Sequence, residues 1–362
     1  MSVQSFPANL KRVYWETTAG CNLRCIHCRR TDVLAKGSPD ELTTQQARNL
    51  IDELALMGKP VLILSGGEPL FRSDIFEVAS YAWKTGLPVA LSTNGTLVNW
   101  SIAQHLKESG IYYASVSFDG ALPVTHDIFR GKGNFERSLR GFLNMKEAGI
   151  KVQINFTVTK KNVQELPEML RLAKDFGAAA LYLFLLVPVG CGIQIADSQM
   201  LSSSEVEKWL KWVYEMDKQG PIPLKAICAP HYFRIADCES RIANLQNKES
   251  YFGLQSEIRN PKSEISERRG CLAGIHMCFI SHKGDVFPCG YLPISAGNIL
   301  RTKLQDIWSN SPVFQNLRDS ELLEGRCGIC SFKRVCGGCR ARAYYAYQNI
   351  LAEEPFCTYQ PV

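Results

Sequence analysis

Three cysteines near the N-terminus have a spacing that could hold a metal cluster. Cys21, Cys25 and Cys28 lie in the segment CNLRCIHC, directly after a predicted strand over residues 13–18. Three thiolates on one short loop can hold three irons of a [4Fe–4S] cluster and leave the fourth iron without a protein ligand. An open coordination position is typical of a catalytic metal site, whereas structural sites are closed. The segment therefore indicates a metal centre that does chemistry.

Zinc is the alternative metal for these three cysteines, with His27 as the fourth ligand. His27 adjoins Cys28 in the chain, so the two side chains could not easily share one tetrahedron. The ligand type, together with the position after a strand, favours iron–sulfur over zinc.

A second group of cysteines fills the C-terminal quarter of the chain. Eight thiols are enough for two closed sets of four, and a pair of four-thiolate zinc sites is the alternative. The remaining cysteines, Cys191, Cys228 and Cys238, are interpreted as buried small hydrophobic residues. The eight are Cys271, Cys278, Cys289, Cys327, Cys330, Cys336, Cys339 and Cys357.

Composition narrows the class of protein further. At 46% apolar residues, a chain of 362 can bury a substantial core. Its first residues have no apolar run typical of a signal peptide, and no segment approaches the roughly 18 apolar residues of a membrane span. We therefore expect a cytoplasmic protein with no membrane span, where structural disulfides are disfavoured. The 41 Lys and Arg against 35 Asp and Glu leave a net charge of +6, too weak to argue for nucleic acid but suited to an anionic small molecule.

The elements that would position these cysteines alternate between strands and helices up to about residue 200. This alternation predicts a parallel sheet with crossover helices, either a partial (β/α) barrel or an open doubly wound sheet, with its active site at the carboxyl ends of the strands. No phosphate-binding or dinucleotide-binding glycine motif is present to support nucleotide hydrolysis or NAD binding. The predicted strands cover residues 13–18, 61–64, 88–92, 111–118, 151–158 and 180–187. Thr44 is the predicted cap of one helix, a second helix begins at Ser73, and further helices cover 100–109, 134–148 and 163–177.

The first cluster of cysteines, followed by Gly66-Gly67-Glu68-Pro69 after the second strand, resembles the radical S-adenosylmethionine (SAM) superfamily. The resemblance implies an α/β fold, a partial (β/α)6 TIM-like barrel over residues 1–200. It also implies that SAM chelates the open iron and is cleaved reductively to methionine and a 5′-deoxyadenosyl radical. Carried over by position, the SAM-contacting residues would be Gly66, Gly67 and Glu68 at the amino group, Asn94 and Ser117 at the next two strand ends, and Arg130 at the methionyl carboxylate.

The C-terminal pattern resembles the SPASM domain of radical SAM enzymes. It runs Cys271-x12-Gly284-x4-Cys289, then Cys327-x2-Cys330-x5-Cys336-x2-Cys339, with a late Cys357; the family more often has three residues before the position of Cys339. The resemblance implies a small cysteine-rich iron–sulfur domain over 271–362, joined to the barrel by a helical or loop connection over 201–270. It also implies two auxiliary [4Fe–4S] clusters, three clusters in all. One would be held by Cys271, Cys278, Cys289 and Cys339, and the other by Cys327, Cys330, Cys336 and Cys357.

Several further segments resemble the haem-biosynthetic branch of the SPASM enzymes, above all its haem synthases. These are WETT at 15–18, HCR at 27–29, KAICAPHYFR at 225–234 and the tail after Cys339. The resemblance implies an oxidoreductase that oxidatively decarboxylates two propionates of iron-coproporphyrin III to vinyl groups and so forms haem b. It also implies an electron donor such as a ferredoxin or flavodoxin.

Two arginines and one histidine are the predicted substrate contacts. Propionates need basic partners, and Arg340 and Arg342 stand beside a predicted cluster ligand. The alternative is that they only cap carbonyl groups or face solvent. His231 is either an axial ligand of the porphyrin iron or a hydrogen-bonded core histidine.

Three other functions remain open. A sibling enzyme would process didecarboxysirohaem or act in haem d1 synthesis, and a peptide-modifying SPASM enzyme would share every cluster cysteine. The non-enzyme alternative is a cysteine-rich zinc or electron-transfer module.

Overall fold

One continuous sheet of ten strands forms the framework of the described part of the chain. The structure is a computed structural model that describes residues 9–31, 34–220, 222–239 and 270–361. The strand order is β10-β9-β8-β1-β2-β3-β4-β5-β6-β7, and β1 to β7 are parallel neighbours in sequence order. Their bounds are β1 Arg12–Glu16, β2 Val61–Ser65, β3 Val89–Thr93, β4 Ile111–Ser117, β5 Lys151–Val158, β6 Leu181–Leu185 and β7 Leu224–Ile227.

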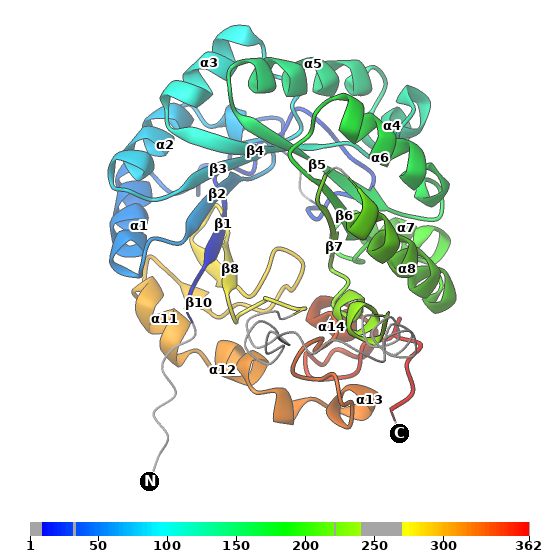
Figure 1. Ribbon diagram of the computed structural model, residues 1–362. Helices are drawn as coiled ribbons and strands as arrows, with labels where there is room; N and C mark the ends of the chain where they lie inside the picture. The colour runs from blue at the N-terminus through cyan, green and yellow to red at the C-terminus, as the bar shows by residue number, and fades with distance from the viewer. Residues whose placement is uncertain (1–8, 32–33, 221, 240–269, 362) are drawn as a thin grey trace, which may run out of the picture.

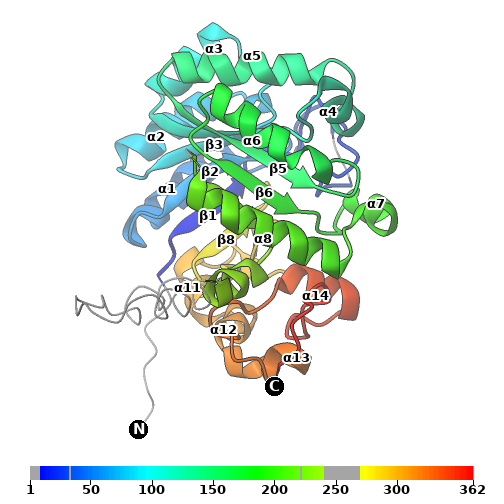
Figure 2. The same ribbon diagram turned by 45° about the vertical axis from the view of Figure 1, so that its right-hand side comes forward.

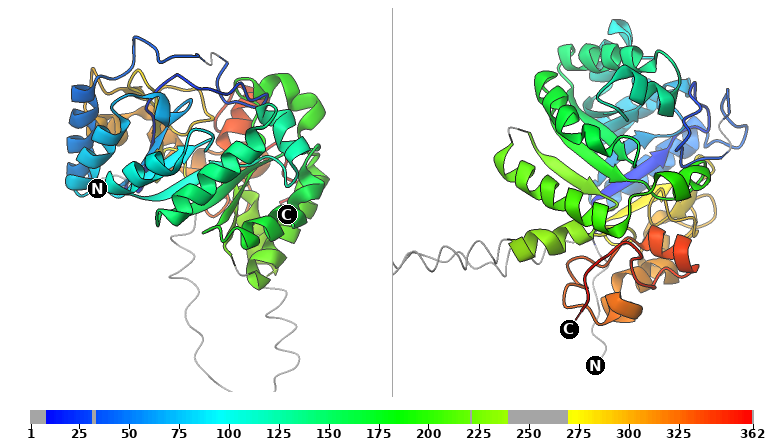
Figure 3. Two further views of the ribbon diagram at one scale, coloured as in Figure 1. Left: turned by 90° about the horizontal axis from the view of Figure 1, so that it is seen from above. Right: turned by 90° about the vertical axis from the view of Figure 1, so that its right-hand side faces the viewer.

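Helices cover the outer face of this curved sheet, as Figure 1 shows in a view down the barrel. Each crossover between neighbouring parallel strands runs through one or two helices, as parallel pairing requires. The view from above in Figure 3 shows these helices as an outer layer on the strands. They are α1 Thr44–Leu56, α2 Ile75–Lys84, α3 Trp100–Glu108, α4 Pro123–Arg130, α5 Asn134–Glu147, α6 Leu166–Asp175, α7 Gly192–Gln199 and α8 Ser203–Gln219.

The main core lies between the sheet and the helices. Side chains alternate between the two faces of a strand, and in β1 Val13 and Trp15 are fully buried in this core. Tyr14 and Glu16, at the intervening positions, therefore point to the barrel interior. The parallel register matches Val13 to Leu62, and Leu62 belongs to the same core. The inner face of the sheet is thus free to carry polar and aromatic side chains.

All six predicted strands are present, and the fold class is confirmed. Helix boundaries shift by a few residues, because caps rather than apolar periodicity decide them. Helix α1 begins one residue earlier than the predicted cap implies: Thr43 accepts a hydrogen bond from the Gln46 amide at 3.2 Å, and the Gln46 side chain accepts one from the Thr43 amide at 2.8 Å.

The barrel continues beyond the boundary predicted at residue 200. Helix α8 buries Trp209 and Leu210 against the main core, and β7 pairs with β6. The predicted connection over 201–270 therefore supplies a helix and a strand to the barrel, and residues 231–239 are helical; residues 240–269 lie outside the described residues. A strand of four residues is too short to show a clear alternation in the sequence.

The C-terminal region extends the sheet at the β1 edge of the barrel. Strand β8 (Met277–Ile280) pairs in parallel with β1, and β9 (Asp285–Phe287) and β10 (Gly297–Asn298) extend the sheet. Figure 2 and the right-hand view of Figure 3 show the C-terminal helices together on one side of the barrel. These helices are α11 Leu304–Asn310, α12 Pro312–Arg318, α13 Gly325–Gly328 and α14 Arg340–Tyr347.

Apolar side chains as well as cysteines hold this region together. Ile307 and Trp308 of α11 and Phe314 of α12 belong to the barrel's main core. A second apolar cluster, built around Val187, Leu292 and Leu317, also contains Cys339. Within the described residues, no helix combines the length and apolar character that crossing a membrane requires.

Candidate active site

The loop after β1 brings Cys21, Cys25 and Cys28 together at the carboxyl end of the barrel. The Cys28 amide donates to the Cys25 carbonyl at 3.1 Å, and the Leu23 amide approaches the Cys21 sulfur at 3.4 Å. Burial raises the pKa of Cys21 to about 11 and of Cys25 to about 12, and the thiols raise one another's pKa further. Grouped thiols with raised pKa values are held in their charged form only by a bound cation. This donor set fits an iron–sulfur cluster.

The surroundings of these three cysteines do not support the zinc alternative. Among the described residues, no three His, Cys, Asp or Glu side chains converge closely enough to hold a single metal ion. His27, the fourth ligand of the zinc alternative, instead directs Nε2 at a carboxylate oxygen of Asp119, 3.2 Å away.

Gly66 and Gly67 hold the end of β2 against the cysteine loop. The Gly67 amide donates to the Thr18 carbonyl at 2.9 Å, and the Glu68 amide donates to the Gly20 carbonyl at 2.7 Å. A Cβ atom on Gly67 would lie 2.3 Å from the Gly20 oxygen, so a side chain cannot fit there without moving the backbone. The glycines therefore fix the distance between the Glu68 carboxylate and the cysteine loop.

Substitution of Gly67 by alanine is expected to destabilise the protein by about 1–3 kcal/mol, because the new methyl group forces two backbone segments apart. Denaturant unfolding of the anaerobically purified variant measures the loss. An unchanged unfolding midpoint would contradict the tight packing of these two loops.

Glu68 is fully buried beside the next strand end. Its carboxylate accepts hydrogen bonds from the Thr93 hydroxyl at 2.7 Å and from the Asn94 amide at 2.8 Å. Burial outweighs these bonds and raises the pKa of Glu68 to about 7. The Asn94 side chain bonds to Asn22 at 2.9 Å and lies 4.0 Å from the Cys21 sulfur. The predicted residues Glu68 and Asn94 are thus brought to the cysteine loop together.

Arg130 reaches the same loop from α4. Its Nη1 lies 3.7 Å from the Cys25 sulfur, while its Nε donates to Asp119 at 2.5 Å. Burial alone would raise the pKa of Asp119, but the positive charge of Arg130 and the bond from His27 hold it well below its usual range. Asp119 was not among the predicted site residues, and its position two residues after the end of β4 was the signal available in the sequence. Ser117 is the last residue of β4 and is half-buried.

The buried carboxylate of Glu16 holds the C-terminal end of the cysteine loop in place. Glu16, at the end of β1, accepts from Arg29 at 2.6 Å and from Arg30 at 2.5 Å, and its other oxygen lies 2.8 Å from His282 Nδ1. The group ties β1, the loop and the turn after β8 together. No substrate or cofactor role had been predicted for these residues.

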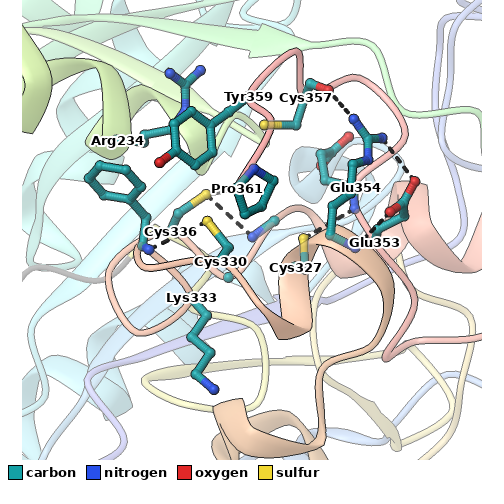
Figure 4. A pocket seen from close by; sticks show the side chains of 14 residues that line it. Arg234, Cys327, Cys330, Lys333, Cys336, Glu353, Glu354, Cys357, Tyr359 and Pro361 are labelled. Atoms are coloured by element: carbon teal, nitrogen blue, oxygen red, sulfur yellow. Dashed lines mark hydrogen bonds and ion pairs between the residues drawn. The ribbon is translucent and has the colours of Figure 1, made fainter.

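Four of the C-terminal cysteines line one pocket, shown in Figure 4. Backbone amides approach three of the sulfurs: Phe332 to Cys330 at 3.4 Å, Gly338 to Cys336 at 3.5 Å and Glu354 to Cys327 at 3.3 Å. Such bonds orient thiolate ligands and tune the potential of a cluster. The pocket also contains Cys357, together with Arg234 and Tyr359. These four thiols are the predicted second auxiliary set.

The predicted first auxiliary set is brought together only in part. Cys339 and Cys289 share the second apolar cluster, and the Cys271 thiol raises the pKa of both. Cys278 does not join them: it lies in β8, is fully buried, and belongs to the main core. The strand directs the Cys278 side chain to the helix-covered face of the sheet, apart from the other three thiols of this predicted set.

Arg340 and Arg342 are committed to contacts inside the protein. Arg340 donates to the carbonyls of Ile350 at 2.9 Å and Ala352 at 2.7 Å. Arg342 forms two hydrogen bonds to Glu354, at 2.9 Å and 3.2 Å, with both side chains only 1% exposed. These positions favour the alternative in which the arginines cap carbonyls and neutralise a carboxylate rather than bind propionates.

His231 begins the helical residues 231–239 and is also fully buried. Burial lowers the pKa of His231 to about 4, so the ring is neutral near pH 7. Neither ring nitrogen has a hydrogen-bond partner among the described residues. A neutral imidazole is the form that ligates metals. Its enclosure places it away from any open substrate surface among the described residues.

Comparison with known proteins adds independent findings. Residues 15–173 match the model of the radical SAM superfamily, and residues 271–340 match the SPASM iron–sulfur cluster-binding domain. The AdoMet-dependent heme synthase of Methanosarcina barkeri is 48% identical over 350 residues, covering 96% of each chain. The AdoMet-dependent heme synthase of Oleidesulfovibrio alaskensis is 42% identical over 96% of this chain and 87% of its own. The pre-heme d1 synthase of Dinoroseobacter shibae is 33% identical over 95% and 85%.

Solved structures share the fold at lower identity. Streptococcus suis SuiB bound to S-adenosylmethionine superposes with a TM-score of 0.72 at 17% identity, covering 97% of this chain and 78% of that one. The native enzyme anSMEcpe with bound AdoMet superposes with a TM-score of 0.67 at 19% identity, covering 96% and 94%.

Proposed function

This chain belongs to the radical SAM superfamily, and we propose that it is an AdoMet-dependent haem synthase that oxidatively decarboxylates iron-coproporphyrin III to haem. The observation that carries the proposal is the identity of 41–48% to three haem synthases over nearly their whole length. The Fe-coproporphyrin III synthase and pre-heme d1 synthase that it also matches are only 32–33% identical, and the mycofactocin maturases are 30% identical. The ranking favours the haem synthases over both the sibling and the peptide-modifying alternatives.

The N-terminal cysteine loop is where the reaction starts. When a [4Fe–4S] cluster is bound by Cys21, Cys25 and Cys28, it supplies the electron for cleavage of SAM. The chain's own residues position SAM beside it. A positively charged amino group next to the buried Glu68 would favour the charged carboxylate and lower its raised pKa. Asp119 holds Arg130 at the cysteine loop, where the guanidinium could pair with the methionyl carboxylate.

Arg340 and Arg342 are used in contacts inside the protein, but other basic side chains on the inner face of the barrel could bind the propionates. Lys225 of β7 aligns with Tyr182 of β6 and lies 5.2 Å from the centre of its ring, on the face opposite the main core. Arg12 and Tyr182 both affect the pKa of Tyr14, so these side chains lie near one another on the inner side of the sheet. Aromatic walls with flanking cations suit a planar tetrapyrrole that carries propionates.

The overall change at each propionate balances as loss of one hydrogen atom, one carbon dioxide and one electron, leaving a vinyl group. The hydrogen atom goes to the deoxyadenosyl group of SAM. The electron needs an acceptor, and an iron–sulfur cluster held by the cysteines of the SPASM domain would supply one. An external donor such as a ferredoxin or flavodoxin would reduce the N-terminal centre.

Anaerobic incubation with SAM, a strong reductant and iron-coproporphyrin III is expected to give haem b and two deoxyadenosines per haem. Chromatography and mass spectrometry measure both products. Parallel reactions with didecarboxysirohaem, and with no tetrapyrrole, are the controls and should give no vinyl product. Deoxyadenosine without haem b, or conversion of didecarboxysirohaem instead, would refute the substrate assignment.

A further inference from the structure

The position of Cys278 on strand β8 keeps its side chain away from the other C-terminal cysteines. In the parallel ladder between β8 and β1, Cys278 aligns with Val13 and Ile280 aligns with Trp15. Aligned residues of neighbouring strands point to the same face of a sheet. Val13, Trp15, Cys278 and Ile280 are all fully buried in the main core, on the face that the helices cover. The Cys278 thiol therefore points away from the barrel interior.

Cys228, rather than Cys278, is the fourth thiol close to Cys271, Cys289 and Cys339. It follows β7 directly, at the carboxyl end of the barrel, and packs in the second apolar cluster with Cys289 and Cys339. Burial is the largest cause that raises the pKa of Cys228, and the thiols of Cys339, Cys289 and Cys271 raise it further. By contrast, within the part of the chain that the structure describes, no other cysteine contributes to the raised pKa of Cys278, and Arg318 is the one charged neighbour that affects it.

The backbone at Cys228 is also unusual. Its φ angle is 56°, one of only three positive values among the non-glycine residues that the structure describes. Residues with larger side chains rarely adopt this conformation, which persists where the surrounding structure holds it in place. The turn redirects the chain between β7 and the helical residues 231–239, and it leaves the Cys228 side chain among the cysteines of the SPASM domain.

We propose that Cys228, Cys271, Cys289 and Cys339 together form a four-thiolate site for an auxiliary [4Fe–4S] cluster, and that Cys278 is a core residue without a metal. Four thiolates close the site, so it can transfer electrons but cannot bind SAM. Arg342 lies close to both Cys228 and Cys339 while it pairs with Glu354. The ligand set joins the barrel to the SPASM domain, because Cys228 belongs to the barrel.

The site also lies on the substrate side of the barrel. Cys228 raises the pKa of Tyr14, on the inner face of β1, and of Tyr291, which follows Cys289 by two residues. A cluster there would be next to the interior space in which we place the tetrapyrrole. This location depends on the proposed function, whereas the ligand set itself does not.

Two single-residue variants separate the alternatives, both made in the full-length chain and purified anaerobically. Cys228→Ala is expected to lose about four irons and four sulfides per chain, together with one electron paramagnetic resonance signal of the dithionite-reduced protein. Cys278→Ala is the matched control: it also removes a buried thiol, but it should keep the iron, the sulfide and every signal. Its only expected defect is a lower denaturation midpoint.

A serine variant tests the proposal even if Cys228→Ala does not fold. Cys228→Ser offers an oxygen ligand of similar size, and it should keep the fold while shifting the spectrum of one cluster. Both variants are also made in a chain that lacks the Cys21, Cys25 and Cys28 thiols, so that only auxiliary signals remain. Full iron and unchanged spectra in both Cys228 variants would overturn the proposal, as would loss of a cluster in Cys278→Ala. Failure of the haem-forming assay with these spectra intact would reject the proposed function alone.

Discussion

Replacing Cys25 with alanine is expected to abolish SAM cleavage and to remove about four irons per chain. Cys25 is one of three thiols on the loop after β1. A cluster with only three protein ligands is lost when one of them is removed. Its sulfur also lies 3.7 Å from Arg130, so the change removes the negative charge that faces this guanidinium. Formation of deoxyadenosine from SAM and dithionite measures the activity, and iron and sulfide analysis measures the cluster.

Cys191→Ser is the matched control for this experiment. The Cys191 thiol donates to the Arg30 carbonyl at 3.0 Å, and Cys28 raises the pKa of Cys191, so this cysteine is a neighbour of the loop. A serine hydroxyl can make the same hydrogen bond. The variant should therefore keep its iron and its SAM cleavage. Loss of a cluster in Cys191→Ser, or a Cys25→Ala protein with full iron and activity, would refute a centre held by three thiols.

Replacing Glu16 with glutamine is expected to lower the free energy of unfolding by about 3–5 kcal/mol. The carboxylate is 2% exposed and lies within 2.8 Å of Arg29, Arg30 and His282. An amide of the same shape leaves two guanidiniums without their anion in a buried site. Because Arg29 and Arg30 follow Cys28 directly, cluster retention should fall as well. Urea unfolding under anaerobic conditions measures the stability, and iron analysis measures the retention.

The pH dependence of this deficit follows from the Glu16 pKa. Burial would raise this pKa, but Arg29, His282 and Arg30 together lower it far below its ordinary value. A carboxyl group with a lowered folded pKa contributes its full stability above the unfolded pKa of about 4.3 and loses it as the pH falls through the folded value. The deficit of Glu16→Gln should therefore be constant between pH 6 and pH 8.

Glu77→Gln provides the control for charge removal by itself. Glu77 pairs with Arg48 at 2.7 Å, but both side chains are exposed. An exposed pair of this kind contributes less than about 1 kcal/mol. An equal loss in the two variants would show that burial of the Glu16 network contributes nothing.

Short-range patterns made the N-terminal site predictable. Cys21, Cys25 and Cys28 lie within eight residues, so almost any conformation of the loop keeps the thiols close. The approach of Gly66, Gly67 and Glu68 to this loop followed from one further rule, that parallel strands align their carboxyl ends. The structure shows this alignment in the register of Glu16 with Ser65.

The destinations of Arg340 and Arg342 could not be predicted in the same way. Their partners, the carbonyls of Ile350 and Ala352 and the carboxylate of Glu354, follow a turn after α14 and become neighbours only in the folded chain. In the sequence, an arginine beside a cysteine motif looks the same whether it binds a substrate or caps a helix end. Burial and the available hydrogen-bond acceptors decide between the two.

The sequence by itself determined the class of fold, the family and the loop that starts the chemistry, because each depends on residues that are close in the chain or on a period that repeats. The tertiary structure alone decided which cysteines of the C-terminal array meet. A strand alternates its side chains between two faces, and the face that Cys278 takes depends on pairing with Val13, far away in the sequence. Cys228 likewise reaches Cys289 and Cys339 only because β7 closes one edge of the barrel opening against the SPASM domain.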